Sequence, residues 1–202
     1  HIIYNIKGVI FSKKKQIDLS ETFFLKSHYI ESNFEDPIKN LYLIYLKKGN
    51  VGAAIDFAKK LYKLNVSNDL YNYYLAYAYE LQNNDHEAIN YYKSCIELNG
   101  PNKIKALNNI GGLYLRNNKT KTSLNFFLKA EELIEKDQII TNNIFLNYIK
   151  LKNHNKSDEY FIKSQKINNE FIEFLYNKAL YFILKENFNE AIQILIKEKK
   201  NL

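Results

Sequence analysis

The sequence predicts an all-α fold made of a repeated pair of helices, and three observations lead to this prediction. The chain has 202 residues and 46% hydrophobic content, which suffices for a buried core and excludes a mainly disordered chain. Only 6 Gly and 2 Pro are present, which argues against a turn-rich β-sandwich or barrel. Similar residues also recur every 34 positions, with one extra residue near Gly100 and Pro101, as expected for a repeat protein.

Six repeats are predicted within a single domain. Their ranges are 1–34, 35–68, 69–103, 104–137, 138–171 and 172–202. The eleventh place is always aromatic: Phe11, Tyr45, Tyr79, Tyr114, Tyr148 and Phe182. The twentieth place is always small: Ser20, Ala54, Ala88, Ser123, Ser157 and Ala191. A recurrence in phase over the whole chain indicates one supersecondary unit repeated six times.

Each repeat is expected to hold two amphipathic helices, with a short polar break near its fifteenth place. In the first repeat this break contains Lys13, Lys14 and Lys15. The second repeat starts with Asp36 and Pro37, which suit a first helical turn, and breaks at 47–50. Two helices separated by such a short break are expected to pack antiparallel.

The later repeats carry clearer signals for the ends of helices. Asn84 with Glu87 in the third repeat and Asn187 with Glu190 in the sixth have capping-box spacing. Gly100 with Pro101 is a stop signal. Small residues at the eighth place, namely Gly8, Ala76, Gly111 and Ala179, predict that the two helices of a pair approach closely and that the eleventh-place ring fills the space beside them.

This pattern resembles the tetratricopeptide repeat family over the whole chain. The third repeat carries the signature at Leu75, Ala76, Tyr79, Ala88, Tyr92 and Cys95, and the fourth at Ile110, Gly111, Tyr114, Ser123, Phe127 and Ala130. The chain departs from it at Lys7, where an aliphatic residue is expected, and at Phe145, where a small one is expected. The resemblance implies a right-handed superhelical solenoid whose first helices line a concave face.

No catalytic or metal-binding constellation is predicted, so we expect no enzyme activity and no cofactor. The histidines are His1, His28, His86 and His154, and the last two fall at or beside turns two repeats apart. Cys95 takes a small, buried place without a histidine to activate it, which predicts an inert thiol. No stretch approaches the roughly 20 apolar residues that a membrane span needs.

The resemblance places partner binding on the concave groove. The predicted residues are Lys39, Asn40, Leu43, Tyr73, Tyr77, Asn109, Arg116, Asn143, Leu146, Tyr176, Asn177 and Leu180. The amides at the sixth place could hold the backbone of an extended peptide, but hydrogen bonds between helices would use them equally well. Apolar side chains with a basic border favour a helical or extended segment with hydrophobic anchors and acidic flanks.

The predicted function is a non-enzymatic scaffold for a protein or peptide partner in a larger assembly, such as a cell-envelope or motility structure. The alternatives are the peptide-sensing half of a transcriptional regulator and an RNA-binding repeat protein. RNA binding is disfavoured because only Arg116 is an arginine, despite a net charge of +7. A carboxylate clamp for chaperone C-termini is disfavoured too, since only Lys39 and Lys105 match its five places.

Three questions stay open at this point: the partner, the compartment (cytoplasmic or periplasmic) and the oligomeric state. The chain starts at His1 and contains no Met, so we expect a piece of a longer protein. Ile192, Leu195 and Ile196 have no following helix in the sequence, which predicts further repeats or end-to-end self-association.

Overall fold

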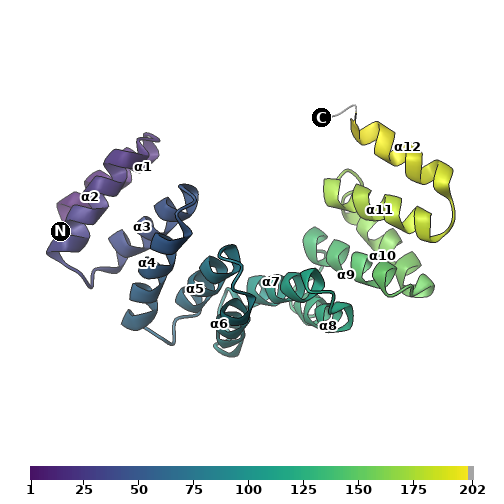
Figure 1. Ribbon diagram of the computed structural model, residues 1–202, viewed down its shortest axis with the longest axis horizontal. Helices are drawn as coiled ribbons and strands as arrows, with labels where there is room; N and C mark the ends of the chain where they lie inside the picture. The colour runs from purple at the N-terminus through teal and green to yellow at the C-terminus, as the bar shows by residue number, and fades with distance from the viewer. Residues whose placement is uncertain (200–202) are drawn as a thin grey trace. The chain divides into compact units, whose positions relative to one another are not determined.

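The computed structural model describes residues 1–199, with side chains described to residue 196, and shows twelve α-helices and no strand in that range (Figure 1). The helices are α1 (Ile2–Lys13), α2 (Ile17–Ile30), α3 (Glu35–Lys47), α4 (Val51–Leu64), α5 (Asp69–Leu81), α6 (Asp85–Glu97), α7 (Lys103–Arg116), α8 (Thr120–Glu131), α9 (Gln138–Lys150), α10 (His154–Ile167), α11 (Ile172–Leu184) and α12 (Phe188–Lys199). The predicted all-α fold of paired helices is confirmed.

The chain folds into two compact units, an N-terminal unit (1–103) and a C-terminal unit (104–202). Each predicted repeat range corresponds to one helix pair, from α1 and α2 in the first to α11 and α12 in the sixth, except that α7 begins at Lys103, one residue before the fourth range. The grouping of the six repeats into a single domain stays a prediction. Residues 200–202, at the end of the sixth predicted repeat, lie outside the described residues.

The helix-end signals act as predicted. Asn84 accepts a hydrogen bond from the backbone N–H of Glu87 (3.3 Å), and Asn187 accepts one from Glu190 (3.5 Å). At Gly100 a Cβ atom would lie 2.3 Å from the carboxyl carbon of Asp69, so a larger residue would displace that carboxylate. The Asp69 carboxylate in turn accepts the backbone N–H of Asn102 (2.9 Å), which fixes the turn before α7.

Each helix pair is held by a close contact at the twentieth place, which is at most 2% exposed in all six repeats. In the first repeat the Ser20 hydroxyl donates to the carbonyl oxygen of Gly8 over 2.8 Å. The ring of Phe24 covers the same glycine, and a Cβ atom on Gly8 would lie 2.6 Å from that ring. The twenty-fourth place therefore complements the eighth, a pairing that the sequence analysis did not find.

The second repeat reverses the sizes in this pair. Tyr42 occupies its eighth place and Ala58 its twenty-fourth, and both are buried. The Tyr42 ring stacks on Tyr74 of α5 with centroids 4.3 Å apart, and its hydroxyl donates to the Tyr74 carbonyl over 3.0 Å. A large residue on the first helix is therefore accommodated by a small one on the second.

The fifth repeat has large residues at both places, as the unexpected Phe145 foreshadowed. Phe145 is fully buried, with its ring centroid 6.0 Å from Phe161 in the same helix pair. It also lies 6.0 Å from Phe174 and 5.7 Å from Tyr181, both on α11. The bulk thus packs against the next repeat instead of pushing the pair apart. Lys7, the other departure from the family pattern, is exposed.

The eleventh-place ring contacts a second aromatic at the twenty-third place in five of the six repeats, stacked in the first four and tilted by 41° in the fifth. The pairs and their centroid distances are Phe11–Phe23 (5.2 Å), Tyr45–Phe57 (5.5 Å), Tyr79–Tyr91 (5.8 Å), Tyr114–Phe126 (5.5 Å) and Tyr148–Tyr160 (5.3 Å). Four of the twenty-third-place rings also lie beneath a lysine three residues later: Lys26, Lys60, Lys129 and Lys163. Each such cation–π contact at an exposed site contributes about 0.5–1 kcal/mol.

The reversed pair of the second repeat is open to a double-mutant cycle. We expect Ala58→Phe alone to destabilise the chain by about 1–3 kcal/mol through overpacking against Tyr42. Tyr42→Gly alone should cost about 3–5 kcal/mol through the cavity that it leaves. The double variant, which recreates the Gly8 and Phe24 arrangement, should lose at least about 1 kcal/mol less than the sum of the two. Urea unfolding followed by circular dichroism measures this, and strictly additive losses would contradict the pairing.

Candidate partner-binding surface

The first helices of the C-terminal unit are joined by pairs of side-chain amides. Asn143 of α9 donates through Nδ2 to Oδ1 of Asn108 on α7 over 3.0 Å. Asn177 of α11 repeats this bond to Oδ1 of Asn142 on α9 over 2.9 Å. In both cases a sixth-place amide pairs with the fifth-place amide of the preceding repeat. The bonds therefore set α7, α9 and α11 side by side, as one surface.

These amide pairs bear on the predicted peptide clamp. Asn177 is only 6% exposed and Asn142 only 3%, so their amides serve packing between helices. Asn143 is half-buried and uses its Nδ2 for Asn108. Hydrogen bonding between helices, the alternative use of these residues, thus occurs at two of the four predicted positions. A clamp role for Asn40, Asn109 and the Asn143 oxygen stays a prediction.

The predicted site residues differ in exposure. Leu43, Arg116, Tyr176 and Leu180 are exposed, Asn177 is buried, and Lys39, Asn40, Tyr73, Tyr77, Asn109, Asn143 and Leu146 are half-buried. In the N-terminal unit they lie on α3 and α5, and in the C-terminal unit on α7, α9 and α11. That the two sets form one continuous groove stays a prediction.

Two first helices have an exposed leucine at the ninth place, where a surface in contact with water would ordinarily be polar. Leu43 of α3 is 49% exposed and Leu180 of α11 is 44% exposed. We call the ninth-place residues of the second to sixth repeats the groove row; its members are Leu43 and Tyr77 in the N-terminal unit, and Gly112, Leu146 and Leu180 in the C-terminal unit. Tyr176 (52%) and Ile183 (45%) extend the apolar area on α11.

Basic side chains lie one helical turn beyond two members of the groove row. Arg116 follows Gly112 by four residues on α7, and Lys150 follows Leu146 by four on α9, which puts each cation on the same helix face as its row residue. Both cations are exposed. Lys39 at the other end of α3 is paired with Asp36 over 3.0 Å. The C-terminal unit thus combines an apolar row with a basic border.

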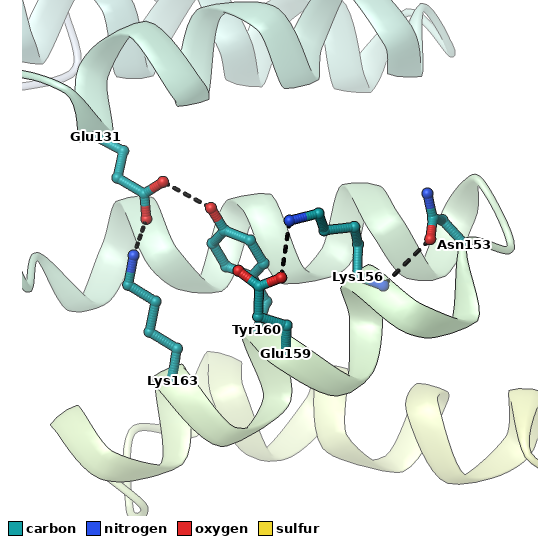
Figure 2. A network of polar contacts seen from close by, with 6 residues as sticks. All are labelled: Glu131, Asn153, Lys156, Glu159, Tyr160 and Lys163. Atoms are coloured by element: carbon teal, nitrogen blue, oxygen red, sulfur yellow. Dashed lines mark hydrogen bonds and ion pairs between the residues drawn. The ribbon is translucent and has the colours of Figure 1, made fainter.

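Carboxylates shared between a tyrosine and a lysine connect neighbouring helices away from the groove row. Figure 2 shows Glu131, at the end of α8, accepting hydrogen bonds from Tyr160 (2.6 Å) and Lys163 (2.5 Å) of α10. Asp158 of α10 likewise accepts from Tyr181 of α11 (2.8 Å) and from Lys185 (3.0 Å). Burial, together with this bond to a carboxylate, raises the pKa of Tyr181 to about 12. These contacts hold successive helix pairs together.

The residues with potential chemistry lie apart from one another. Burial raises the pKa of the Cys95 thiol to about 12, so it stays protonated near neutral pH. His86 and His154 are exposed, and His28 lies 2.8 Å from the Lys60 ammonium, with its pKa lowered by burial and by that charge. Among the described residues no group of three or more His, Cys, Asp or Glu could hold a metal ion.

The class of protein follows from the stacked, close-packed helix pairs: this is a helical-repeat protein. More particularly, residues 71–102 match the family described as Tetratricopeptide repeat, which confirms the resemblance expected from the third repeat. The match is to a repeat family, and no catalytic family is indicated. Within the described residues, no helix has both the length and the apolar character needed to cross a membrane.

Solved structures with the same fold include three that cover most of the chain. PilF of Pseudomonas aeruginosa has a TM-score of 0.81 at 13% identity, covering 98% of this chain and 90% of that one. PilW, a widely conserved type IV pilus biogenesis factor, has 0.83 at 11%, covering 98% and 92%. YrrB, a tetratricopeptide repeat protein with an unusual peptide-binding site, has 0.66 at 18%, covering 86% and 89%. By sequence, no curated protein matches the chain.

The buried Asn142 and Asn177 pair provides a test of the structural role of the amides. Replacing Asn177 alone by Leu leaves the Asn142 oxygen buried without its donor, so we expect a loss of about 1–3 kcal/mol in unfolding free energy. Replacing both residues by Leu should recover most of that loss, because no unsatisfied polar group remains. Urea denaturation of the two single variants and the double variant measures this. If the double variant lost as much unfolding free energy as the two single variants together, the pairing would be contradicted.

A pH effect is expected from Asp158. The Lys185 ammonium, helped by Tyr181 and opposed by burial, lowers the pKa of this carboxyl. The stabilisation is thus fully present above the ordinary pKa of about 3.9 and disappears as the pH falls through the lowered value. Because the Asp158 side chain is 45% exposed, Asp158→Asn should cost less than about 1 kcal/mol near neutral pH.

The stability gap between wild type and Asp158→Asn should narrow as the pH falls from about 7 to about 3. Urea unfolding at several pH values measures the gap. Glu170→Gln, at an exposed carboxylate outside this contact, serves as the matched control and should show a much smaller gap throughout. A gap for Asp158→Asn that does not change with pH would show that the lost interaction is not ionic.

Proposed function

We propose that the chain is a non-enzymatic scaffold that binds partner proteins through groove-row residues of its first helices. The observation that carries this proposal is the exposure of Leu43 and Leu180, 49% and 44%, at equivalent places of different repeats. Scattered exposed leucines are ordinary on protein surfaces, but aligned apolar residues with a polar border are typical of interaction sites. Within the C-terminal unit, α7, α9 and α11 lie side by side and carry three of these places.

The partner segment is expected to carry apolar anchors and acidic residues. Apolar side chains fit the groove row, and Arg116 with Lys150 supplies a basic border that attracts carboxylates. Buried apolar anchors provide most of the binding energy in interfaces of this kind, while charges at the rim act on association rate and specificity. The partner can be helical or extended, since both forms present anchors in a row.

A place in a larger assembly is the second part of the proposal. It is supported by the likeness of fold to PilF and PilW, the latter described as a type IV pilus biogenesis factor. Stacked helix pairs suit such a role because repeat proteins offer extended surfaces for binding. By analogy with these proteins, the assembly is a cell-envelope or motility structure.

Site-specific photo-cross-linking in the source cells tests partner binding. A photoreactive phenylalanine analogue replaces Leu43 or Leu180 in the groove row, or Leu64 (36% exposed) or Ile162 (51% exposed) on the second helices as matched controls. We expect a discrete cross-linked species from positions 43 and 180, and adding Leu146→Glu to the 180 variant should reduce it by about tenfold or more.

Circular dichroism of the same variants checks that helicity is unchanged. Equal cross-linking from the groove row and from positions 64 and 162 would contradict the proposed surface. Cross-linking of RNA instead of protein would favour the RNA-binding alternative over the scaffold.

A further inference from the structure

Gly112 is a helical glycine for which the described residues provide no packing reason. It lies inside α7 next to Gly111, and both have ordinary helical backbone conformations. A Cβ atom on Gly111 would lie 2.7 Å from the Phe127 ring, so that glycine is required by packing. A Cβ atom on Gly112 would meet nothing within 4 Å. Glycine inside a helix is less stable than alanine, so its presence at 112 calls for a cause outside the fold.

The position of Gly112 indicates where that cause lies. It is exposed and occupies the ninth place of α7, in the same groove row as Leu146 on α9 and Leu180 on α11. The amide bond between Asn143 and Asn108 holds α9 beside α7. The row therefore lacks a side chain at Gly112, on the helix beside α9, and we call this open place the notch. Close approach of another molecule to a backbone is a recognised reason for glycine.

The charges beside this notch indicate what would approach. Lys150, one turn beyond Leu146, borders one end of the notch, and Arg116 lies one turn beyond Gly112 with an interaction of its own inside the protein. Both are exposed. A ligand seated over Gly112 and Leu146 would place its flanking residues next to these cations, where carboxylates are favoured and ammonium groups are disfavoured.

We propose that the notch at Gly112 receives one bulky apolar side chain of a partner protein, with acidic residues of the same segment beside Arg116 and Lys150. This inference rests on the proposed function and gives it a specific anchor point. The occupant is a segment of another protein in which an aromatic or large aliphatic residue stands next to Asp or Glu. A side chain lying directly on the α7 backbone would bury more of its surface than one resting on leucine.

The test selects ligands from a displayed library of random peptides, with the full chain as bait. We expect enriched peptides to combine a bulky apolar residue with neighbouring acidic residues. Fluorescence polarisation of one enriched peptide then compares wild type with Gly112→Leu, which fills the notch, and should show affinity reduced by about tenfold or more. Gly52→Leu is the matched control because Gly52 is also an exposed helical glycine, and its affinity should equal that of wild type.

Two further variants examine the premises. Lys150→Glu should weaken the peptide by about threefold or more at low salt and less at high salt, as expected for an exposed charge. Gly112→Ala should raise the melting temperature by about 2–4 °C, while Gly111→Ala should lower it. A Gly112→Ala chain that is less stable than wild type would show that the fold itself needs this glycine, and would overturn the inference.

Other results also overturn it. These are a consensus rich in Lys or Arg, no enriched peptide, equal affinity of wild type and Gly112→Leu, or self-association of the full chain that Gly112→Leu abolishes. In the last case the occupant would be a second copy. If cross-linking from positions 43 and 180 persists while Gly112→Leu binds as wild type does, the scaffold function stands and only the anchor at Gly112 fails.

Discussion

The close approach of the two helices in each pair is the constraint on which the other contacts depend. Helix axes can come near one another only where the residues between them are small, and the twentieth place is at most 2% exposed in every repeat. Once this contact is made, the eighth and twenty-fourth places must share the remaining space. Gly8 with Phe24 and Tyr42 with Ala58 divide it in opposite ways. The eleventh-place ring then meets its partner at the twenty-third place.

Contacts between neighbouring helix pairs depend on the side chains that each pair does not bury within itself. Because the fifth repeat has two large residues, Phe161 stacks on Tyr181 of α11 at 4.7 Å, and the junction becomes aromatic. The amide pairs add hydrogen bonds between the first helices α7, α9 and α11, and these bonds hold the helices that carry Gly112, Leu146 and Leu180 side by side. Lysines at the twenty-sixth place lie over rings, which gives part of the basic composition a packing role. A net charge of +7 is therefore poor evidence for a nucleic-acid surface.

The sequence was enough to predict the helices and the close contact between paired helices, because both depend on a residue property, such as small size, that recurs at the same place of every repeat. The complement between Gly8 and Phe24 was hidden because size varies at each place, and only the pair of places is regular. The aromatic residues at the twenty-third place were visible as five in six. Asn177 could not be assigned because an amide serves a peptide and a neighbouring helix equally well, and only coordinates show that it is buried. Gly112 was also visible in the sequence, as a second glycine beside Gly111 in a helix where packing requires only Gly111.

Gly111 and Gly112 show that the same residue type can be required by packing at one position and have no packing reason at the next. Natural sequences tend to be locally consistent with their structure, and exceptions concentrate at functional or strained positions. Gly111 is consistent once Phe127 is considered, since no larger residue fits beneath that ring. Gly112 has no such neighbour, yet it stands in a row whose apolar members are half-buried or exposed, with Lys150 one turn beyond Leu146. A helix-weakening residue that packing does not require is therefore most useful as a guide to the surface where a partner makes its nearest contact.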